Sequence, residues 1–102
     1  MTQITVEALK AKMDAGENVH LVDVREDIER ADFNIGGIHH RLGLIQTMDT
    51  EALDDWKEEE VIVYCRSGNR SATACLILET MGFTNVVNLQ GGMLAWVDKF
   101  GG

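Results

Sequence analysis

The sequence of 102 residues has no apolar run that would span a membrane. Such a span takes roughly 18 consecutive apolar residues, and every apolar stretch here is shorter. The opening residues, MTQITVEALK, also lack the basic and then apolar pattern of a secretory signal peptide. The sequence therefore predicts neither a membrane protein nor a secreted one, and we expect a cytoplasmic location.

Cysteine is scarce, and basic residues are outnumbered. Two cysteines in a chain without an export signal favour free thiols over a disulfide framework. Nine lysines and arginines stand against seventeen acidic residues, which gives a formal net charge of −8. Because such a surface repels phosphate backbones and anionic lipids, we expect neither nucleic acid nor a membrane as a partner. A small anionic substrate would need a local positive site, and the segment with Arg66 and Arg70 is the clearest one.

The length and composition are those of one domain, so we expect residues 1–102 to fold as a single unit. Predicted strands lie around Ile4 and over 19–24, 35–40, 61–65 and 85–89. Predicted helices lie between Thr5 and Gly16, over 25–32, within 48–56, from about 69 to 82, and over 93–100. This alternation implies an α/β fold with a parallel sheet and helices on both faces. Nothing in the pattern predicts an oligomer, and we expect a monomer.

The segment VIVYCRSGNRSA carries the most specific chemical signal. Cys65 ends a buried strand, at the edge of a parallel sheet where ligands bind. The following turn into a helix leaves about four backbone amides without partners, and Gly68 lets the backbone curl so that they converge. Those amides, the helix dipole and the two arginines would stabilise an anion at Cys65. We therefore predict a reactive thiol that is mostly ionised at neutral pH.

A buried cysteine with a packing role is the alternative for each thiol. The polar residues and the glycine after Cys65 are poor core neighbours, which argues against packing alone there. Cys75 lies in the apolar helical segment ATACLILE, and we predict a buried, inert thiol. The chain has no C-x-x-C pair, zinc pattern or nucleotide-binding loop, so we predict no metal and no cofactor. Gly91 and Gly92 are interpreted as a turn into the last helix.

The number of residues between the cysteine and the arginine of the loop distinguishes between two reactions, phosphate-ester cleavage and sulfur transfer. Cysteine phosphatases carry the loop C-x-x-x-x-x-R, which is one residue longer than the segment from Cys65 to Arg70. A tighter loop favours a smaller guest, namely one extra sulfur atom, over a tetrahedral phosphate. The sequence thus favours sulfur transfer and leaves a cysteine phosphatase or an arsenate reductase as less favoured alternatives.

These residues resemble a known family. CRSGNRSA, with LVDVRE upstream and NLQGGMLAW downstream, is similar to a single-domain rhodanese over nearly the whole chain. The resemblance implies a five-stranded parallel sheet flanked by helices, with Cys65 as the sulfur-carrying nucleophile. It implies a substrate-binding cradle formed by Arg66, Ser67, Gly68, Asn69 and Arg70. It also implies that Asp23 and Arg25 support the site, although a plain salt bridge that orders their turn explains them equally well.

The resemblance implies transfer of a sulfane sulfur from a donor such as thiosulfate to a thiophilic acceptor, cyanide or a thiol. Cys65 would hold the sulfur as a persulfide, and no metal or organic cofactor is implied. A sulfur-relay or docking module is the alternative of a different class. Its Cys65 would be loaded by a sulfur-donor protein, and the acidic surface would be the docking face.

The chain departs from the family in one segment. Members commonly read Gly-His-Ile-Pro-Gly where residues 33–37 read FNIGG, and this chain contains no proline. We therefore expect a more mobile loop at the rim of the pocket. For the residues that follow, one hypothesis is that Arg41, with His40, adds positive charge for an anionic donor. Exposed residues on an edge strand are the alternative.

Overall fold

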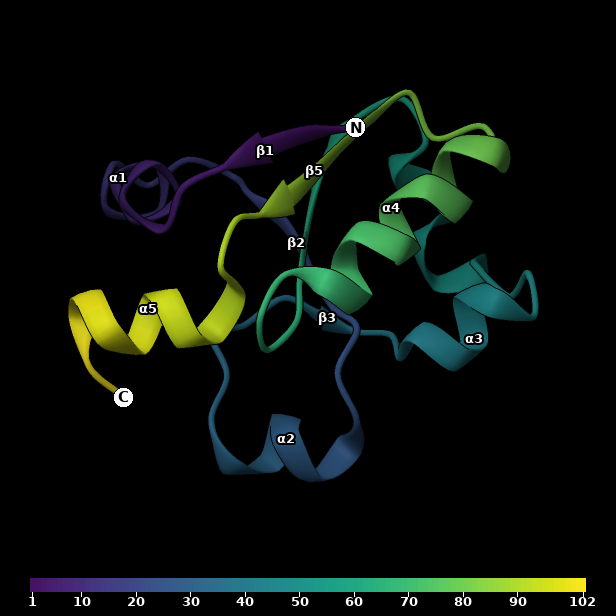
Figure 1. Ribbon diagram of the computed structural model, residues 1–102. Helices are drawn as coiled ribbons and strands as arrows, with labels where there is room; N and C mark the ends of the chain where they lie inside the picture. Colours follow the sequence, from purple (N-terminus) through teal and green to yellow (C-terminus); the bar gives the residue numbers. More distant parts are fainter.

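The computed structural model describes residues 1–102, and strands alternate with helices along the chain (Figure 1). The strands are β1 (Thr2–Ile4), β2 (His20–Asp23), β3 (Ile38–His39), β4 (Glu60–Tyr64) and β5 (Asn85–Leu89). The helices are α1 (Val6–Asp14), α2 (Asp27–Asp32), α3 (Leu42–Gln46), the 3-10 helix η1 (Glu51–Trp56), α4 (Asn69–Thr80) and α5 (Gly92–Phe100). None of these helices has both the length and the apolar character needed to cross a membrane.

All five strands pair in parallel, in the order β1-β5-β4-β2-β3. The central strand β4 lies between β2 and β5, with Val63 in register with Val22 on one side and Asn88 on the other. The predicted five-stranded parallel sheet is therefore confirmed. Parallel pairing places the carboxyl ends of β2, β4 and β5 at one edge of the sheet, which is where such folds bind ligands.

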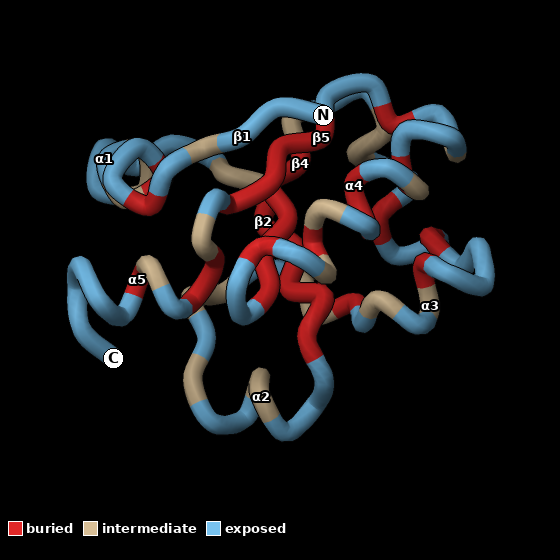
Figure 2. The backbone as a smooth tube through the Cα atoms, viewed as in Figure 1, coloured by how far each residue is buried: buried red, intermediate tan, exposed pale blue.

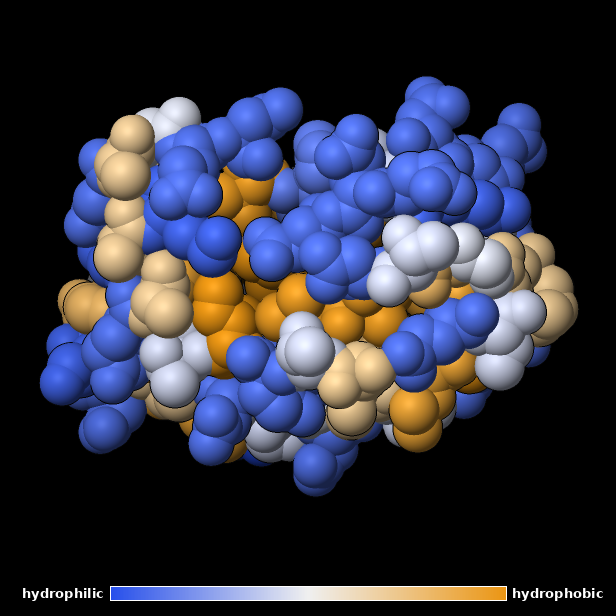
Figure 3. Space-filling view, turned by 90° about the horizontal axis from the view of Figure 1, so that it is seen from above, coloured by the Kyte–Doolittle hydropathy of each residue, from blue (hydrophilic) through white to orange (hydrophobic).

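Helices cover both faces of the sheet, as predicted. The helices α1 and α5 pack on one face, whereas α3 and α4 pack on the other (Figure 1). Figure 2 shows that the buried backbone is concentrated in the central strands between these layers. Much of the outer face seen from above carries hydrophilic side chains around an apolar band (Figure 3).

The pleat of β4 decides which layer each of its side chains enters, because successive residues of a strand point to opposite faces. Ile62 and Tyr64 join the core under α1 and α5, whereas Val61 and Val63 join the core under α4. Cys65 continues this alternation and lies on the α4 side. The strand thus delivers the cysteine to the amino end of α4.

The segment 33–37 is restrained although it lacks proline. Arg30 donates to the carbonyl oxygens of Gly36 and Gly37 at 3.0 and 2.9 Å, and the Tyr64 hydroxyl donates to Gly36 at 2.8 Å. Gly37 has a φ of +85°, and a Cβ there would lie 2.5 Å from the Leu21 side chain. Side-chain hydrogen bonds and a close approach thus hold this loop, so the expectation of a loosely held rim lacks support in these contacts.

Two short elements differ from the prediction. The strand predicted over 35–40 is limited to Ile38–His39, because residues before it form the loop just described. The short helix α3 was not predicted; its Ile45 is fully buried in the α4-side core, and this packing compensates for a segment that contains glycine. The helix predicted within 48–56 is the 3-10 helix η1.

Candidate active site

The sulfur of Cys65 lies under converging hydrogen-bond donors. The backbone amides of Gly68 and Ser71 donate to Sγ at 3.1 and 3.4 Å, and the Ser71 hydroxyl oxygen lies 3.3 Å from Sγ. The predicted convergence of loop amides on residue 65 is therefore present. Cys65 has no exposed surface, so the loop lies closed over the sulfur instead of forming the open cradle that the sequence led us to expect.

The start of α5 sets the direction of the loop backbone. The amides of Met93 and Leu94 donate to the carbonyl oxygens of Cys65 and Arg66, each at 2.9 Å. The first amides of a helix have no partner within the helix, so they are free to bind these carbonyls. Both carbonyls therefore face α5. The turn predicted at Gly91 and Gly92 is confirmed, and it also brings α5 against the loop.

Glycine is needed at two points of this contact. Gly92 has a φ of +56°, and a Cβ there would lie 2.5 Å from the carbonyl oxygen of Cys65. Gly68 has a φ of +98° and precedes α4, so its amide turns towards Sγ while its carbonyl accepts from Ala72 at 3.2 Å. A left-handed backbone at these positions is open to glycine at little cost. The prediction that Gly68 curls the loop is confirmed.

These contacts determine the acidity of the two thiols. Burial raises the pKa of Cys65, but hydrogen bonds from the Ser71 hydroxyl and from the amides of Ser71, Gly68 and Ser67 outweigh burial and lower the pKa below its usual value. Burial raises the pKa of Cys75 to about 12, because that thiol has no comparable donors. The pKa of Cys65 is thus lowered and the pKa of Cys75 is raised, which is the difference that the sequence predicts.

Two residues of the site were missed by the sequence analysis. Ser71, in the first turn of α4, lies just beyond the segment assigned to the cradle. Asn88 of β5 accepts a hydrogen bond from the Ser71 hydroxyl through Oδ1, and its Nδ2 donates to Gly68 O at 3.2 Å and to Gln3 Oε1 at 3.1 Å. The signal that could have found Asn88 is a polar residue between the apolar residues Val87 and Leu89 in the interior of the strand.

The arginine side chains of the loop form no hydrogen bond with the sulfur. Arg70 forms a two-point ion pair with Glu29 of α2, at 2.7 and 2.8 Å. The hydrogen bond from Arg70 lowers the pKa of Glu29 to about 2. The side chain of Arg66 is exposed and has no ion-pair partner. The guanidinium of Arg70 is thus bound to a carboxylate, and its part in an anion cradle at Cys65 stays a prediction.

The remaining cradle residues contribute mainly backbone. Ser67 and Asn69 have exposed side chains, which line a second cavity of about 370 Å³ together with residues of β5. The amide of Ser67 helps to lower the pKa of Cys65, whereas no such contact is recorded for Asn69. The loop therefore acts on the sulfur through its main chain.

Asp23 and Arg25 form the salt bridge that orders the turn after β2. Asp23 is fully buried and accepts from the amide and Nε of Arg25 at 3.0 and 2.9 Å, and from its Nη2 at 3.0 Å. Arg25 also donates to the carbonyl of Phe33 at 2.7 Å. The structure thus contains the salt bridge that orders this turn, and a supporting role of the pair at the active site stays a prediction.

His40 and Arg41 lie apart from the sulfur-binding loop. The ring of His40 is buried, with Nε2 2.6 Å from the carbonyl oxygen of Asp49. Arg41 is exposed, with Nε 3.8 Å from Asp27. Neither residue lines a cavity beside Cys65. The suggested help from His40 is therefore not supported, because its ring nitrogen faces a backbone carbonyl.

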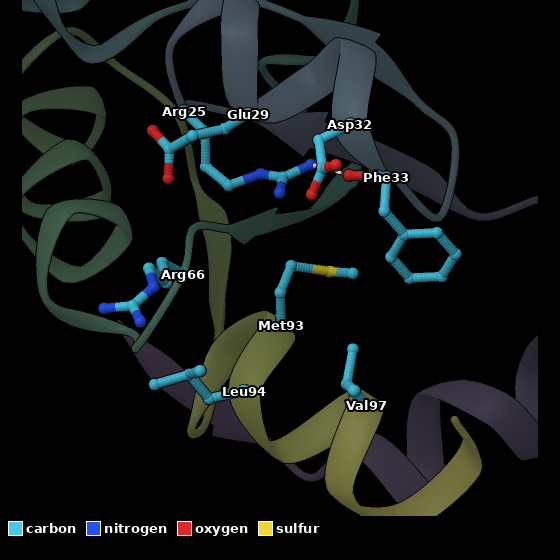
Figure 4. Close-up of a pocket in the computed structure, with 8 residues that line it drawn as sticks. All are labelled: Arg25, Glu29, Asp32, Phe33, Arg66, Met93, Leu94 and Val97. Atoms are coloured by element: carbon cyan, nitrogen blue, oxygen red, sulfur yellow. Dashed lines mark hydrogen bonds between the residues drawn. The ribbon is translucent and has the colours of Figure 1, made fainter. Parts of the chain in front are cut away.

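A cavity of about 240 Å³ opens between α2, α5 and the start of the loop (Figure 4). Figure 4 shows Met93 and Val97 extending from α5 towards Phe33 at the end of α2, whereas Leu94 lies on the other side, near Arg66. Cys65 is not part of this lining, so the loop separates the sulfur from the cavity. The lining residues are Arg25, Glu29, Asp32, Phe33, Arg66, Met93, Leu94 and Val97.

Comparison with known proteins gives a consistent assignment. The family model for the rhodanese-like domain matches residues 5–99. The chain is 44% identical over 95 residues to the Bacillus subtilis protein named "Putative sulfurtransferase YtwF", covering 92% of this chain and 88% of that one. It is 36% identical over 97 residues to a sulfurtransferase of Allochromatium vinosum, covering 94% and 88%.

The solved structures agree with the family model. The crystal structure of a rhodanese-like domain protein from Staphylococcus aureus matches with a TM-score of 0.80 and 34% sequence identity, covering 94% of this chain and 91% of that one. The fold, the position of Cys65 and these similarities lead to one assignment: the chain belongs to the rhodanese-like domain family.

Proposed function

We propose that the protein is a sulfurtransferase in which Cys65 carries a sulfane sulfur from a small anionic donor, such as thiosulfate, to cyanide or a thiol. One observation carries the proposal: backbone amides and a hydroxyl are aimed at the sulfur of a cysteine at the end of the central strand. Preorganised donors of this kind stabilise negative charge without reorganising during the reaction. The family assignment supports the same class of chemistry.

The proposed reaction has two steps. The Cys65 thiolate attacks the outer sulfur of thiosulfate; a new S–S bond forms, the bond within thiosulfate breaks, and sulfite leaves with the electron pair. A thiolate or cyanide then attacks the terminal sulfur of the persulfide, and Cys65 leaves as a thiolate. Because the sulfur is stored covalently between two substrates, ping-pong kinetics are expected.

Access to the sulfur requires movement of the loop. Cys65 is buried, while the neighbouring Arg66 and Ser67 are exposed and carry no side-chain hydrogen bond that would hold them. Outward displacement of these two residues would connect Sγ with the cavity between α2 and α5. The unpaired charge of Arg66 at the rim of that cavity would attract an anionic donor.

Intact mass spectrometry tests the proposal directly. The protein is incubated with thiosulfate and is expected to gain the mass of one sulfur atom. The Cys65→Ala variant should gain nothing, whereas Cys75→Ala, the matched control at the inert thiol, should gain the same mass as the natural chain. Sulfur uptake by Cys65→Ala, or its loss in Cys75→Ala, would place the carrier elsewhere.

A sulfur-relay module is the second candidate, and the buried sulfur favours it. A closed loop over Cys65 suits loading by a protein that opens the loop, and a chain with net charge −8 would suit a basic partner. Slow uptake from thiosulfate together with rapid loading by a persulfide-bearing cysteine desulfurase would select this function. Equal rates from both donors would select the free-standing enzyme.

The phosphatase alternative is weaker. The loop is one residue shorter than that of the cysteine phosphatases, and the guanidinium of its Arg70 is paired with Glu29. Hydrolysis of an aryl phosphate that disappears in Cys65→Ala would restore this alternative.

A further inference from the structure

We propose that Asn88 is a positioning residue that acts on Cys65 through Ser71, by competing with the thiolate for the single hydroxyl proton of Ser71. The proposal rests on the proposed role of Cys65 as the sulfur carrier. It assigns a function to a strand residue outside the loop, and it predicts the sign of a measurable change in the acidity of Cys65.

The orientation of the Asn88 amide is set by its partners. Nδ2 lies 3.2 Å from the carbonyl oxygen of Gly68, and a carbonyl oxygen only accepts hydrogen bonds. The second proton of Nδ2 reaches Gln3 Oε1 at 3.1 Å. Oδ1 must therefore be the atom that faces Ser71, and Oδ1 only accepts.

The hydroxyl of Ser71 thus stands between two acceptors. Its oxygen hydrogen-bonds Asn88 Oδ1 and lies 3.3 Å from Cys65 Sγ, yet it has a single proton to donate. All three side chains are buried: Cys65 and Ser71 have no exposed surface and Asn88 has 4%. Cys65 and Ser71 line none of the cavities, whereas Asn88 also lines the second cavity, and leaving an acceptor without a donor at such a buried position is costly.

The proton arrangement changes with the charge on sulfur. When Cys65 is a neutral thiol, its S–H donates to Ser71 Oγ and the Ser71 O–H donates to Asn88. When the thiol loses its own proton to solvent, the Ser71 O–H turns towards Sγ and Asn88 Oδ1 loses its donor. No covalent bond of Ser71 changes. Ionisation of Cys65 therefore carries the cost of breaking the Ser71–Asn88 hydrogen bond.

This cost has a use in sulfur transfer. The nucleophilicity of a thiolate falls as its pKa falls, so a thiolate that is stabilised too strongly attacks slowly. Asn88 limits the stabilisation that Ser71 gives to the thiolate. When Cys65 becomes a persulfide, Sγ no longer carries the charge, and the hydroxyl is free to return to Asn88.

The charged and titratable groups around Cys65 are few. Arg70 and Cys75 face it from α4, and Arg66 follows it in the loop. Glu29 of α2 pairs with Arg70 and offsets its charge. On the β5 and α5 sides, Asn88 and the amide of Met93 are neutral. The Ser71 hydroxyl proton is therefore the group whose position follows the ionisation of Cys65.

The experiment measures the pKa of Cys65 from the pH dependence of iodoacetamide alkylation, in a Cys75→Ala background so that one thiol reports. Asn88→Leu removes the competing acceptor and is expected to lower the pKa by about one unit, a tenfold change in ionisation. Ser71→Ala is expected to raise the pKa by about one unit. The double variant should match Ser71→Ala, because Asn88 acts only through the hydroxyl.

The double variant separates this role from a structural one. Asn88→Leu also removes the donor to the carbonyl of Gly68, and a loosened loop would change the pKa equally with or without Ser71. An equal change in both backgrounds, or an unchanged or raised pKa in Asn88→Leu alone, overturns the proposal. Gln3→Ala, which leaves Oδ1 of Asn88 in place, serves as the control and should leave the pKa unchanged.

A second variant covers the case in which Asn88→Leu does not fold. Asn88→Asp keeps the size of the side chain and strengthens the acceptor that faces Ser71, although it replaces the Nδ2 donor to Gly68 with an oxygen. It is expected to raise the pKa of Cys65, with a smaller rise when Ser71 is alanine. Equal rises in both backgrounds would show a direct effect of the added charge and would overturn the proposal. Alkylation reports the pKa of Cys65 and needs no sulfur donor, whereas mass spectrometry reports sulfur uptake. A negative result in one assay therefore leaves the other assay informative.

Discussion

The guanidinium of Arg70 and the carboxylate of Glu29 form a two-point ion pair, at 2.7 and 2.8 Å, across 41 positions of sequence. The pair joins the amino end of α4, where the sulfur-binding loop ends, to α2. It occupies the arginine that would otherwise face an anion at Cys65, so the acidity of the thiol depends on neutral donors.

Acid should weaken this connection. Because Arg70 lowers the pKa of folded Glu29 from 4.5 to about 2, its contribution to stability is present above about pH 4.5 and is lost as the pH falls towards 2. Both side chains are partly exposed, so we expect a modest contribution of about 1 to 2 kcal/mol. Urea unfolding of the natural chain and of Glu29→Gln should converge at low pH. The control Glu58→Gln changes an exposed carboxylate without an ion-pair partner. Its free energy of unfolding should follow that of the natural chain at every pH.

Because α5 packs closely against the loop, we expect that a side chain at Gly92 cannot be accommodated without a shift of the loop. In Gly92→Ala, the new Cβ would meet the carbonyl of Cys65 at 2.5 Å, so the loop must shift and the pKa of Cys65 should rise. Gly82→Ala is the matched control, because Gly82 also has a positive φ but open space around it. We expect about 1 kcal/mol of lost stability from backbone strain in the control, and more in Gly92→Ala. Equal unfolding free energies and equal alkylation profiles would contradict this account.

Two exposed arginines, Arg66 and Arg41, should differ in their effect on the binding of an anionic donor. Arg66 lines the cavity between α2 and α5, whereas Arg41 does not. We expect Arg66→Ala to raise the KM for thiosulfate several-fold, with a smaller effect at high salt because exposed charges are screened. Arg41→Ala should leave the KM unchanged, and an increase equal to that of Arg66→Ala would revive the hypothesis that Arg41 attracts the donor.

Removing the buried carboxylate of Asp23 should lower the stability of the fold more than it affects sulfur transfer. In Asp23→Asn, Arg25 keeps its charge without a buried counter-charge, and we expect a loss of about 3 kcal/mol in the free energy of unfolding. Replacing both partners by apolar residues, in Asp23→Leu with Arg25→Met, should recover part of that loss. If this double variant folds and still gains one sulfur atom from thiosulfate, the pair supports the site without taking part in the reaction; a folded variant that gains none would indicate a direct role.

The local pattern was sufficient for much of the fold. The apolar run VIVY predicted β4, because a strand with layers on both faces is apolar at successive positions. The polar, glycine-containing segment after it predicted the turn into α4 and the donors aimed at Cys65. The burial of Cys75 was also predicted, because its neighbours in the helix are apolar, and the inertness of its thiol stays a prediction.

Contacts between distant segments explain what the sequence could not predict. Ser71 gains its role from Asn88, which strand pairing brings from β5 to the side of the loop. The pairing of Arg70 with Glu29 of α2 was likewise not predicted, because the two residues lie far apart in the sequence.

The sequence by itself determined the alternation of strands and helices along the chain apart from α3, the cysteine at the end of the central strand, and the glycine that turns the loop. These features follow from side-chain periodicity and from backbone conformations that only neighbouring residues influence. The tertiary structure alone decided that the sulfur is buried, that Arg70 binds Glu29, and that Asn88 reaches Ser71. Hydrogen bonds and ion pairs depend on which atoms meet in space, and only the packed sheet and its helices bring these atoms together.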